Sequence, residues 1–328
     1  MFSVSDGLLS ILACPRDRHP LTRNGTRLLC IAGHSYPVVD GVPVLLLPEL
    51  GQAAPGERIH PAISNSLQQA ENPGPDPFEG KGVHPQVQAM VSSTNGHMYD
   101  GLKLTEYPIP RLRWNPGEGR SLLDVGCNWG RWTIAAAKAG YRPIGLDPHL
   151  TSLRAARHVA RSAGADARFV CGDARAMPFK SGVFERAFSY SVIQHFSKQE
   201  ARAILSEMAR TLTPGGQTLV QMPNRQGIRS FYHLARRRFA EGTAFDVRYY
   251  SPHELLEYFG FEIGPSELSI DGFFGLGIQP DDIAIMPRLR KIVIRGSEAL
   301  RRLARRQPWL ADYADSLYVT SQKPRAVG

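Results

Sequence analysis

Short apolar runs alternate with amphipathic segments along most of this 328-residue chain. Runs typical of strands occupy residues 120–126, 142–147, 167–173, 186–193 and 217–224, and helical patterns occupy residues 131–140, 150–164 and 194–212. Strands that alternate with helices of this length favour a parallel sheet with helices on both faces. We therefore expect an α/β domain on a doubly wound, mostly parallel sheet, which binds ligands at the carboxyl ends of its strands.

The pattern changes toward both ends of the chain. Residues 1–48 read as short strands around the turn dipeptide Asp40-Gly41, so we expect a small β-rich module there. Residues 49–83 are rich in Pro, Gly and polar residues and are expected to form a linker. Residues 84–328 then form the main domain, in which we expect a C-terminal extension at about 225–310 to shape a substrate site.

Composition places the chain among globular proteins, because 42% of its residues are hydrophobic. No apolar run is long enough to cross a bilayer, and four cysteines do not suggest a disulfide framework, so we expect a cytoplasmic protein. Cys127 and Cys171 are expected to be buried thiols. The net charge is −3 over residues 1–80, +13 over 81–240 and −1 over 241–328. The positive charge of residues 81–240 suits binding of an anionic substrate, a nucleic acid or a membrane surface, although it also increases solubility.

The stretch LLDVGCNWGRW, residues 122–132, predicts a strand, a glycine turn and a helix. A dinucleotide loop needs a glycine where Asn128 stands, and the Lys-Ser/Thr pair of a Walker loop is missing from the sequence. Asp124 at the strand end would repel a phosphate and attract an ammonium group. The turn therefore predicts a cofactor that carries a cation rather than a pyrophosphate.

Together with the stretches GLDPHL, VCGDARAMPF, FSYSVIQHF and LTPGGQTLVQMPN, this turn resembles the class I S-adenosylmethionine-dependent methyltransferases. The resemblance implies a seven-stranded Rossmann-like sheet and S-adenosylmethionine as the cofactor. It implies that Asp147 binds the ribose hydroxyls and that Asp173 lies near the adenine amino group. The cofactor-binding residues it implies are Asp124, Gly126, Cys127, Asn128, Gly130, Arg131, Asp147, Pro148, Asp173, Ala174, Tyr190 and Ser191.

Two residues at the start of the following helix are assigned different roles. Arg131 is expected to pair with the methionine carboxylate of the cofactor or with substrate. Trp132 is expected to pack into the core, because large apolar residues at helical spacing usually do.

The acceptor side of such a site must align a nucleophile with the methyl carbon and, for a hydroxyl, remove its proton. His195, just past the fourth strand, is our candidate base, since imidazole titrates near neutral pH; the alternative is a histidine that only caps or packs. Candidate substrate-binding residues are Asn95, Tyr99, Gln194, Tyr249 and Tyr250.

The favoured function is O-methylation of a small-molecule, glycan or lipid-linked acceptor. The first alternative is methylation of rRNA or tRNA, which is less favoured because no Asn-Pro-Pro-Tyr-type motif follows the fourth strand. The second alternative is a scaffold subunit that binds the cofactor without turnover.

The N-terminal module resembles the Trm112-like zinc ribbons, from CPRD to YPVVDGVPVLL. The resemblance implies a zinc site at Cys14, Asp17, Cys30 and His34, in which Asp17 and His34 replace two cysteines of that family. The alternative is a metal-free β module. In either case we expect the module to be structural or to bind a protein partner.

The C-terminal extension contains a strongly basic stretch, residues 288–306, with eight Lys or Arg and one acid. Its apolar residues share one helical face, which is typical of a helix that lies on an anionic membrane or of a solvated helix over a core stripe. The membrane reading would place the protein peripherally at the inner membrane face and make a lipid-linked acceptor attractive.

Overall fold

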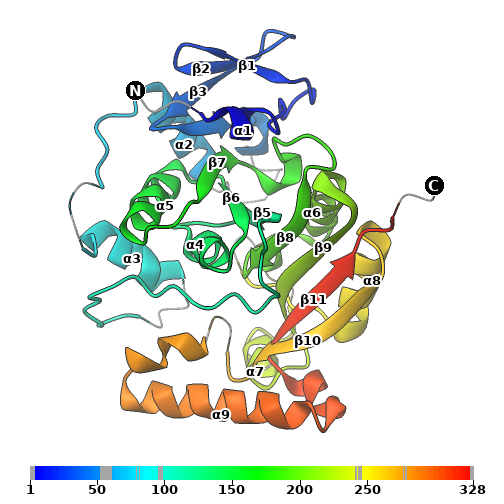
Figure 1. Ribbon diagram of the computed structural model, residues 1–328. Helices are drawn as coiled ribbons and strands as arrows, with labels where there is room; N and C mark the ends of the chain where they lie inside the picture. Colours follow the sequence, from blue (N-terminus) through cyan, green and yellow to red (C-terminus); the bar gives the residue numbers. More distant parts are fainter. Residues whose placement is uncertain are drawn as a thin grey trace.

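The computed structural model describes residues 4–51, 61–78, 80, 82–94, 99–240, 242, 246–275, 277 and 279–325 (Figure 1). Its centre is a mixed sheet. The strands of the main domain are β5 (Ser121–Val125), β6 (Arg142–Asp147), β7 (Arg168–Gly172), β8 (Phe184–Tyr190), β9 (Leu212–Pro223), β10 (Ser266–Gly272) and β11 (Ser316–Gln322). Their spatial order is β7-β6-β5-β8-β9-β11-β10, in which β11 runs antiparallel to both neighbours and the first five strands are parallel. The expected doubly wound, mostly parallel seven-stranded sheet is confirmed.

Helices cover both faces of this sheet. The α-helices of the described residues are α1 (Asp6–Leu9), α2 (Ala62–Glu71), α3 (Pro85–Thr94), α4 (Arg131–Lys138), α5 (Leu150–Ser162), α6 (Lys198–Thr211), α7 (Ile228–Arg236), α8 (Pro252–Glu262) and α9 (Arg288–Ala304). Short 3-10 helices are η1 (Pro48–Gly51), η2 (Ala174–Ala176), η3 (Ile193–His195), η4 (Pro280–Ala284) and η5 (Pro308–Tyr313). None of the helices in the described part of the chain is long and apolar enough to cross a membrane.

Alternation along β5 explains the layers. Leu123 and Val125 face one core, which includes residues of α6 and α8, whereas Leu122 faces the opposite core beside Trp132 of α4. Both faces of β5 are therefore buried, which is why Leu122, Leu123 and Val125 are all apolar. Trp132 is buried and its ring lies 4.6 Å from that of Tyr190, so the expected core role of Trp132 is confirmed.

The N-terminal module adds four strands to the main sheet. They are β1 (Leu21–Asn24), β2 (Arg27–Cys30), β3 (Ser35–Val39) and β4 (Val42–Leu45). Asp40 and Gly41 both have positive φ, 50° and 78°, as a two-residue hairpin requires, and they join β3 to β4. Strand β4 pairs in parallel with β7, so the sheet continues from the module into the main domain and contains eleven described strands.

Two segments differ from the sequence-based expectation. The expected linker contains α2, which packs against α5 because Ser66 donates to the carbonyl oxygen of Pro148 (2.8 Å) and accepts from the N–H of Leu150 (2.9 Å). In the C-terminal extension the stretch FEIGPSEL, residues 261–268, also reads as a strand, but β10 begins only at Ser266, since α8 continues to Glu262.

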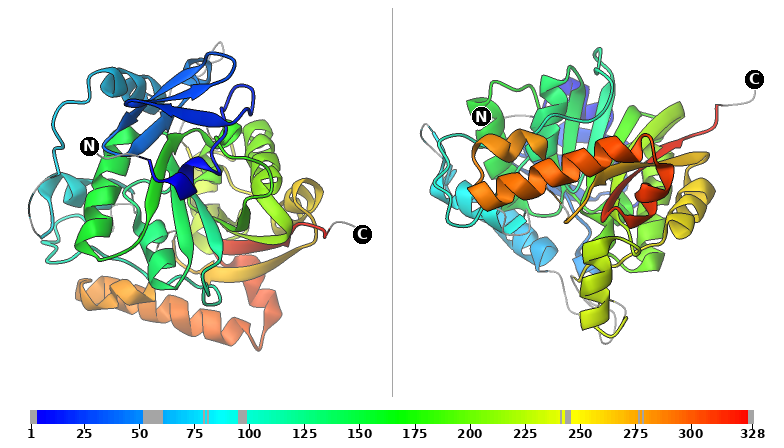
Figure 2. Two further views of the ribbon diagram at one scale, coloured as in Figure 1. Left: turned by 45° about the horizontal axis from the view of Figure 1, so that its top comes forward. Right: turned by 90° about the horizontal axis from the view of Figure 1, so that it is seen from below.

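The carboxyl ends of the parallel strands point toward the lower part of Figure 1, where α9 runs across the molecule. In the view from below, α9 lies across the surface and α7 projects beside it (Figure 2). Both helices belong to the C-terminal extension that was expected to shape the acceptor site.

Candidate functional site

The glycine turn after β5 requires both of its glycines. Gly126 has φ 77° and Gly130 has φ 82°, a region that other residues rarely adopt. A Cβ on Gly126 would also come within 2.3 Å of Val192, which lies two residues past the carboxyl-terminal end of β8. The turn therefore holds the main chain against β8 and delivers it to the N-terminus of α4.

Asn128 is the residue that replaces the second glycine of a dinucleotide loop. Its φ is 46°, and its side-chain oxygen accepts from the N–H of Trp129 at 2.8 Å. Its own N–H donates to Asp147 at 2.9 Å. Asparagine tolerates positive φ because its side chain can bond locally, so the turn is stable without a glycine here.

Asp124 lies beneath the turn. It is buried, and its carboxylate accepts a 2.6 Å hydrogen bond from the Thr133 hydroxyl of α4. Burial raises the pKa of Asp124 to about 7; the Thr133 hydrogen bond opposes that shift, and the nearby charge of Asp147 adds to it. Its contact with the cationic end of a cofactor stays a prediction.

Asp147 ends β6, the strand next to β5. Its two oxygens accept from the backbone N–H groups of Asn128 and His149, each at 2.9 Å. Each carboxylate oxygen can accept more than one hydrogen bond, so both retain capacity for hydroxyl donors. Burial raises the pKa of this carboxyl, and the two backbone hydrogen bonds oppose that effect. Pro148 follows it and uses its carbonyl oxygen to hold α2.

Asp173 follows β7, the next strand, and is buried. The Arg175 guanidinium donates to both of its oxygens, at 2.8 and 3.0 Å, and also to Glu200 at 2.7 Å. Burial disfavours the charge on Arg175, but the bonds to Asp173 and Glu200 outweigh it and raise the arginine's pKa. Ala174 lies beside this pair in η2. If Asp173 accepts a hydrogen bond from the adenine amino group, the same carboxylate also remains bound to Arg175.

The end of β8 carries the residues expected near the acceptor. Ser191 has a positive φ of 59°, a strained conformation that is common at functional sites. Its hydroxyl accepts from the Gln194 side-chain nitrogen at 2.8 Å, and the buried Gln194 Oε1 has no hydrogen-bond partner in the described part of the chain. His195 follows in η3 and is partly exposed. The structure thus brings Ser191, Gln194 and His195 together, whereas their roles stay predictions.

Tyr190 points away from this group. Its hydroxyl donates to Asp271 at 2.7 Å and accepts from Gln279 at 2.8 Å. Ser316 also donates to Asp271 at 2.7 Å. Burial raises the pKa of Tyr190 well above its usual value, and the charge of Asp271 acts in the same direction. Asp271, near the end of β10, is a site residue that the sequence did not indicate, because no motif near it signals its pairing with Tyr190.

Arg131 forms an ion pair within the protein that the sequence did not predict. Its guanidinium is buried and forms an ion pair with Asp282 at 2.8 Å, and it donates to the Tyr99 hydroxyl at the same distance. The Tyr99 hydroxyl in turn donates to Asp282 at 2.6 Å. Both candidates therefore belong to a network that fastens η4 to the start of α4, and a cofactor or substrate contact stays a prediction.

The remaining candidates are dispersed. Tyr250 is buried in the core beside α8, and Tyr249 is partly exposed with the Arg237 guanidinium 5.6 Å from its ring. Cys127 is a buried free thiol, as expected, and so is Cys171. Asn95 lies outside the described residues.

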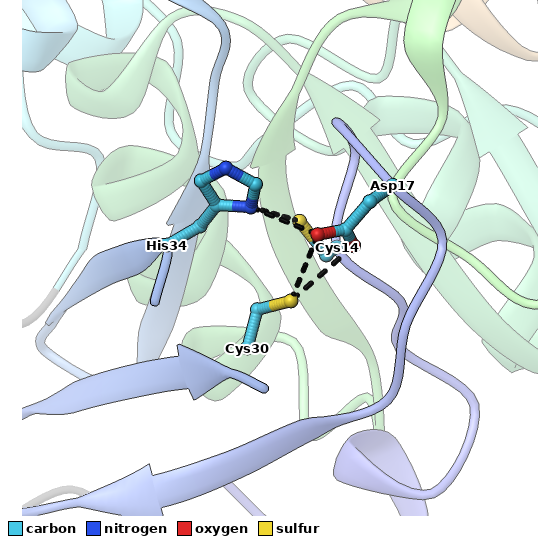
Figure 3. A group of neighbouring side chains, drawn as sticks. All are labelled: Cys14, Asp17, Cys30 and His34. Carbon is cyan, nitrogen blue, oxygen red and sulfur yellow. Dashed lines mark hydrogen bonds and ion pairs between the residues drawn. The ribbon is translucent and has the colours of Figure 1, made fainter. Parts of the chain in front are cut away.

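A second cluster lies in the N-terminal module (Figure 3). The ligand atoms of Cys14, Asp17, Cys30 and His34 all lie within 4.8 Å of one another. Cys30 Sγ donates to Asp17 at 3.0 Å, His34 Nδ1 lies 2.9 Å from Asp17, and Cys14 Sγ lies 3.5 Å from the same ring nitrogen. Two sulfurs, one imidazole nitrogen and one carboxylate oxygen at this spacing fit tetrahedral zinc.

Comparison with known proteins gives one family match, between residues 122–216 and a methyltransferase domain. An uncharacterised methyltransferase from Synechocystis is 29% identical over 135 residues, which cover 40% of this chain and 60% of that protein. A UPF0434 protein from Vesicomyosocius okutanii is 40% identical over 47 residues, which cover 14% of this chain and 80% of that protein.

A solved S-adenosylmethionine-dependent methyltransferase from Methanosarcina mazei aligns with a TM-score of 0.43 and 18% identity, over 63% of this chain and 94% of that one. The chain spans 27% and 60% of the length of two methyltransferase relatives that it matches.

Proposed function

Because this chain belongs to the class I S-adenosylmethionine-dependent methyltransferases and contains a UPF0434-type segment, we propose that it transfers a methyl group to an oxygen of a small-molecule, glycan or lipid-linked acceptor. One observation carries the proposal. Three buried aspartates, Asp124, Asp147 and Asp173, lie at or next to the carboxyl ends of three adjacent parallel strands, around a glycine turn. An anionic edge of this kind suits a cation with neutral hydroxyl and amino donors and repels a pyrophosphate.

The residues present fit the cofactor. Both carboxylate oxygens of Asp147 retain acceptor capacity for the ribose hydroxyls. Asn128 stands where a dinucleotide loop needs a glycine for the pyrophosphate to approach the backbone. When bound, S-adenosylmethionine supplies an electrophilic methyl group on a positively charged sulfur. The chain's task is to hold the acceptor oxygen in line with that carbon and to exclude water.

His195 is the proposed base for the acceptor hydroxyl. It lies one residue past Gln194, whose buried Oε1 has no hydrogen-bond partner among the described residues, and close to the strained Ser191. In this scheme Gln194 accepts a hydrogen bond from the acceptor and His195 removes the proton that methylation displaces. An imidazole base gives a rate that rises with pH through its pKa, near neutrality.

The metal cluster has a separate, structural role in this proposal. Zinc held by Cys14, Asp17, Cys30 and His34 would cross-link the loop before β1 to the β2–β3 hairpin, far along the chain from the glycine turn. Four protein ligands leave no open position for substrate, as in structural zinc sites.

Calorimetric titration with S-adenosylmethionine tests the cofactor claim. The Asp147→Ala variant loses the charged acceptor for the ribose, so we expect its affinity to fall about 10- to 100-fold, since a hydrogen bond to a charged group contributes roughly 1.5–3 kcal/mol. The matched control is Asp166→Ala, which removes an exposed aspartate between α5 and β7. Equal affinities for the wild type and both variants would contradict the proposal.

Transfer of labelled methyl groups to lipid, glycan and RNA fractions tests the acceptor. Labelled lipid, glycan or another small molecule supports the proposal, and labelled RNA alone overturns the acceptor class. Binding of cofactor without transfer to any fraction would favour the scaffold alternative.

A further inference from the structure

Exposed large apolar side chains are concentrated on two segments of the C-terminal extension. Among the described residues, thirteen large hydrophobic side chains are exposed, and ten of them lie in residues 228–239 and 289–313. These ten are Ile228, Phe231, Tyr232, Phe239, Leu289, Ile292, Val293, Leu303, Trp309 and Tyr313. We call them, with the basic side chains around them, the α7–α9 surface. A concentration of this kind marks a binding surface, because scattered single residues are the normal pattern.

These side chains are not the core stripe of their helices. Helix α9 buries Ile294, Ser297 and Ala304 against the protein, while Leu289 is 78% exposed and Ile292 is 64% exposed. Helix α7 likewise buries Ser230 and Leu234 and leaves its aromatic residues in solvent. Each helix therefore has an inner face that is already satisfied and a second apolar face that is open.

The charges on the same segments are almost all positive. Residues 228–239 contain four arginines and no acid, and residues 289–313 contain seven basic residues and two acids, Glu298 and Asp312. Glu298 is bound by Arg301 at 2.7 Å and by Arg113 at 3.2 Å. The surface thus combines a strong positive field with apolar side chains, and its complement is an anionic surface with an apolar interior.

Asp315 holds the two segments at one place in the fold. Its carboxylate accepts from the N–H groups of Arg229 and Ser230 at the start of α7, at 2.6 and 2.9 Å. It also accepts from the N–H of Phe274 at 2.7 Å, next to Phe273, whose N–H donates to Ser297 of α9 at 2.9 Å. Both helices are therefore anchored where β10 ends and β11 begins, at the carboxyl edge that bears the cofactor turn (Figures 1 and 2).

A cavity opens within this surface. It has a volume of about 420 Å³ and is lined by Arg225, Gln226, Phe231, Leu234, Phe239 and Ser251. Arg225 and Gln226 lie two and three residues past the end of β9, whose neighbour β8 is followed by Ser191 and Gln194. A cavity lined by Phe231, Leu234 and Phe239 together with an arginine suits a molecule with a hydrocarbon part and an anionic group.

We propose that the α7–α9 surface binds an anionic lipid bilayer and that the methyl acceptor is a lipid or lipid-linked molecule taken from it. The second part rests on the proposed function, whereas the first does not. The aliphatic residues Leu289, Ile292 and Leu303 favour a bilayer over RNA, since RNA is bound mainly by stacking on aromatic rings and by contacts to phosphates, whereas the five aromatic residues of the surface suit either partner. A second copy of the chain is disfavoured because two strongly positive surfaces repel each other.

Vesicle sedimentation without cofactor tests the surface. The full-length protein is mixed with vesicles of phosphatidylcholine alone or with about one third phosphatidylglycerol, a fraction that gives a negative surface potential. We expect binding to the anionic vesicles, binding at least about tenfold weaker to the neutral ones, and a decrease with salt. Failure of the wild type to sediment with anionic vesicles overturns the proposal.

Variants separate the apolar and charged parts of the surface. Leu289→Ser/Ile292→Ser and Phe231→Ser/Tyr232→Ser keep every charge, and Arg302→Glu/Arg305→Glu/Arg306→Glu keeps every apolar residue. Each is expected to weaken vesicle binding about tenfold or more, without changing the thermal midpoint, because all these side chains are exposed. The control is Phe261→Ser on α8, since Phe261 is as exposed as Leu289, at 78%, but lies outside the surface. Equal binding by the Leu289/Ile292 variant and the wild type contradicts the proposal.

Two further measurements distinguish the failures. If a single-stranded RNA competes fully with vesicles and the serine variants bind both normally, the surface is an RNA-binding one and the lipid proposal is wrong. Calorimetry with S-adenosylmethionine is run on the same variants. Normal vesicle binding without cofactor binding supports the membrane-binding surface and contradicts the proposed methyltransferase function. Normal cofactor binding by a wild type that does not bind vesicles contradicts only the membrane-binding surface.

Discussion

Arg131 and Asp282, 2.8 Å apart and both buried, join the first residue of α4 to the 3-10 helix that precedes α9. The Tyr99 hydroxyl bonds to both side chains. The segment between β10 and β11 is therefore fixed to the helix that starts at the glycine turn. An ordered cofactor turn and an ordered α9 are expected to support each other.

Removing one partner of this ion pair is expected to lower the free energy of unfolding. Asp282→Ala leaves the Arg131 charge buried without its counter-ion, so we expect a loss of about 3–5 kcal/mol in the free energy of unfolding, measured in urea. Asp281→Ala is the matched control, because Asp281 is exposed and, among the described residues, accepts a hydrogen bond from the backbone N–H of Arg111 rather than from a buried charge. The double variant Arg131→Met/Asp282→Leu should recover much of the loss, since a well-packed apolar pair avoids the unpaired charge. A loss of the same size in the control would show that the pair is not the cause.

The stability of the cofactor-free protein is expected to depend on the protonation of Asp124. Its folded pKa of about 7 lies above the unfolded value of 3.8, so between these values the folded state binds the extra proton. This carboxyl therefore destabilises the fold as pH rises, by up to about 1.4 kcal/mol per unit, and the effect ends above the folded pKa. The isosteric variant Asp124→Asn lacks that titration.

Urea unfolding of the wild type and Asp124→Asn at several pH values measures this difference. The variant should gain stability relative to the wild type between pH 4 and pH 7 and then keep a constant offset. Asp166→Asn is the control, since Asp166 is exposed. An offset between Asp124→Asn and wild type that does not change over this range would show that burial leaves this carboxyl unshifted.

The N-terminal cluster is expected to bind about one zinc ion per chain, as four-ligand structural sites do. Metal analysis of Cys30→Ser and His34→Ala should show loss of zinc, because each removes one of the four ligands. His19→Ala is the control, since this exposed histidine lies two residues from Asp17 but outside the cluster. Chelation should lower the thermal midpoint of the wild type, and a wild-type protein that is purified without zinc and does not take it up would contradict the site.

Module and main domain are expected to unfold in a single transition, since β4 and β7 belong to one sheet. Leu45→Ala removes a buried side chain of β4, and we expect it to cost about 2–5 kcal/mol and to lower every spectroscopic transition together. Ile31→Ala is the control within the same module, because Ile31 is 86% exposed. Two separate peaks in calorimetry would mean that the module folds on its own.

The sequence predicted the parts of the molecule that depend on neighbours along the chain. The end of β5, the glycine turn and the placement of Asp147 and Asp173 follow from alternation and from turn chemistry, which are local. Helix α2 was missed because the Pro- and Gly-rich residues around it outweighed its helical pattern.

The partners of the site residues could not be predicted in the same way. Asp282 reaches Arg131, and Asp271 reaches Tyr190, only after the chain has crossed several strands, and nothing near either residue in the sequence signals the pairing. Such long-range pairs are set by how the C-terminal extension folds back over the sheet.

The pairing of β4 with β7 has a consequence for how the protein is made. Four strands of the module leave the ribosome long before β7 does, so β4 must wait with an open hydrogen-bonding edge until Cys171 and Gly172 arrive opposite Val44 and Leu45. Open strand edges recruit other strands, so this edge of the module is exposed to wrong pairings until β7 has been made. The same pairing later closes the outer edge of β7. Strand β4 must therefore avoid pairing with other strands during synthesis and must pair with β7 in the final fold.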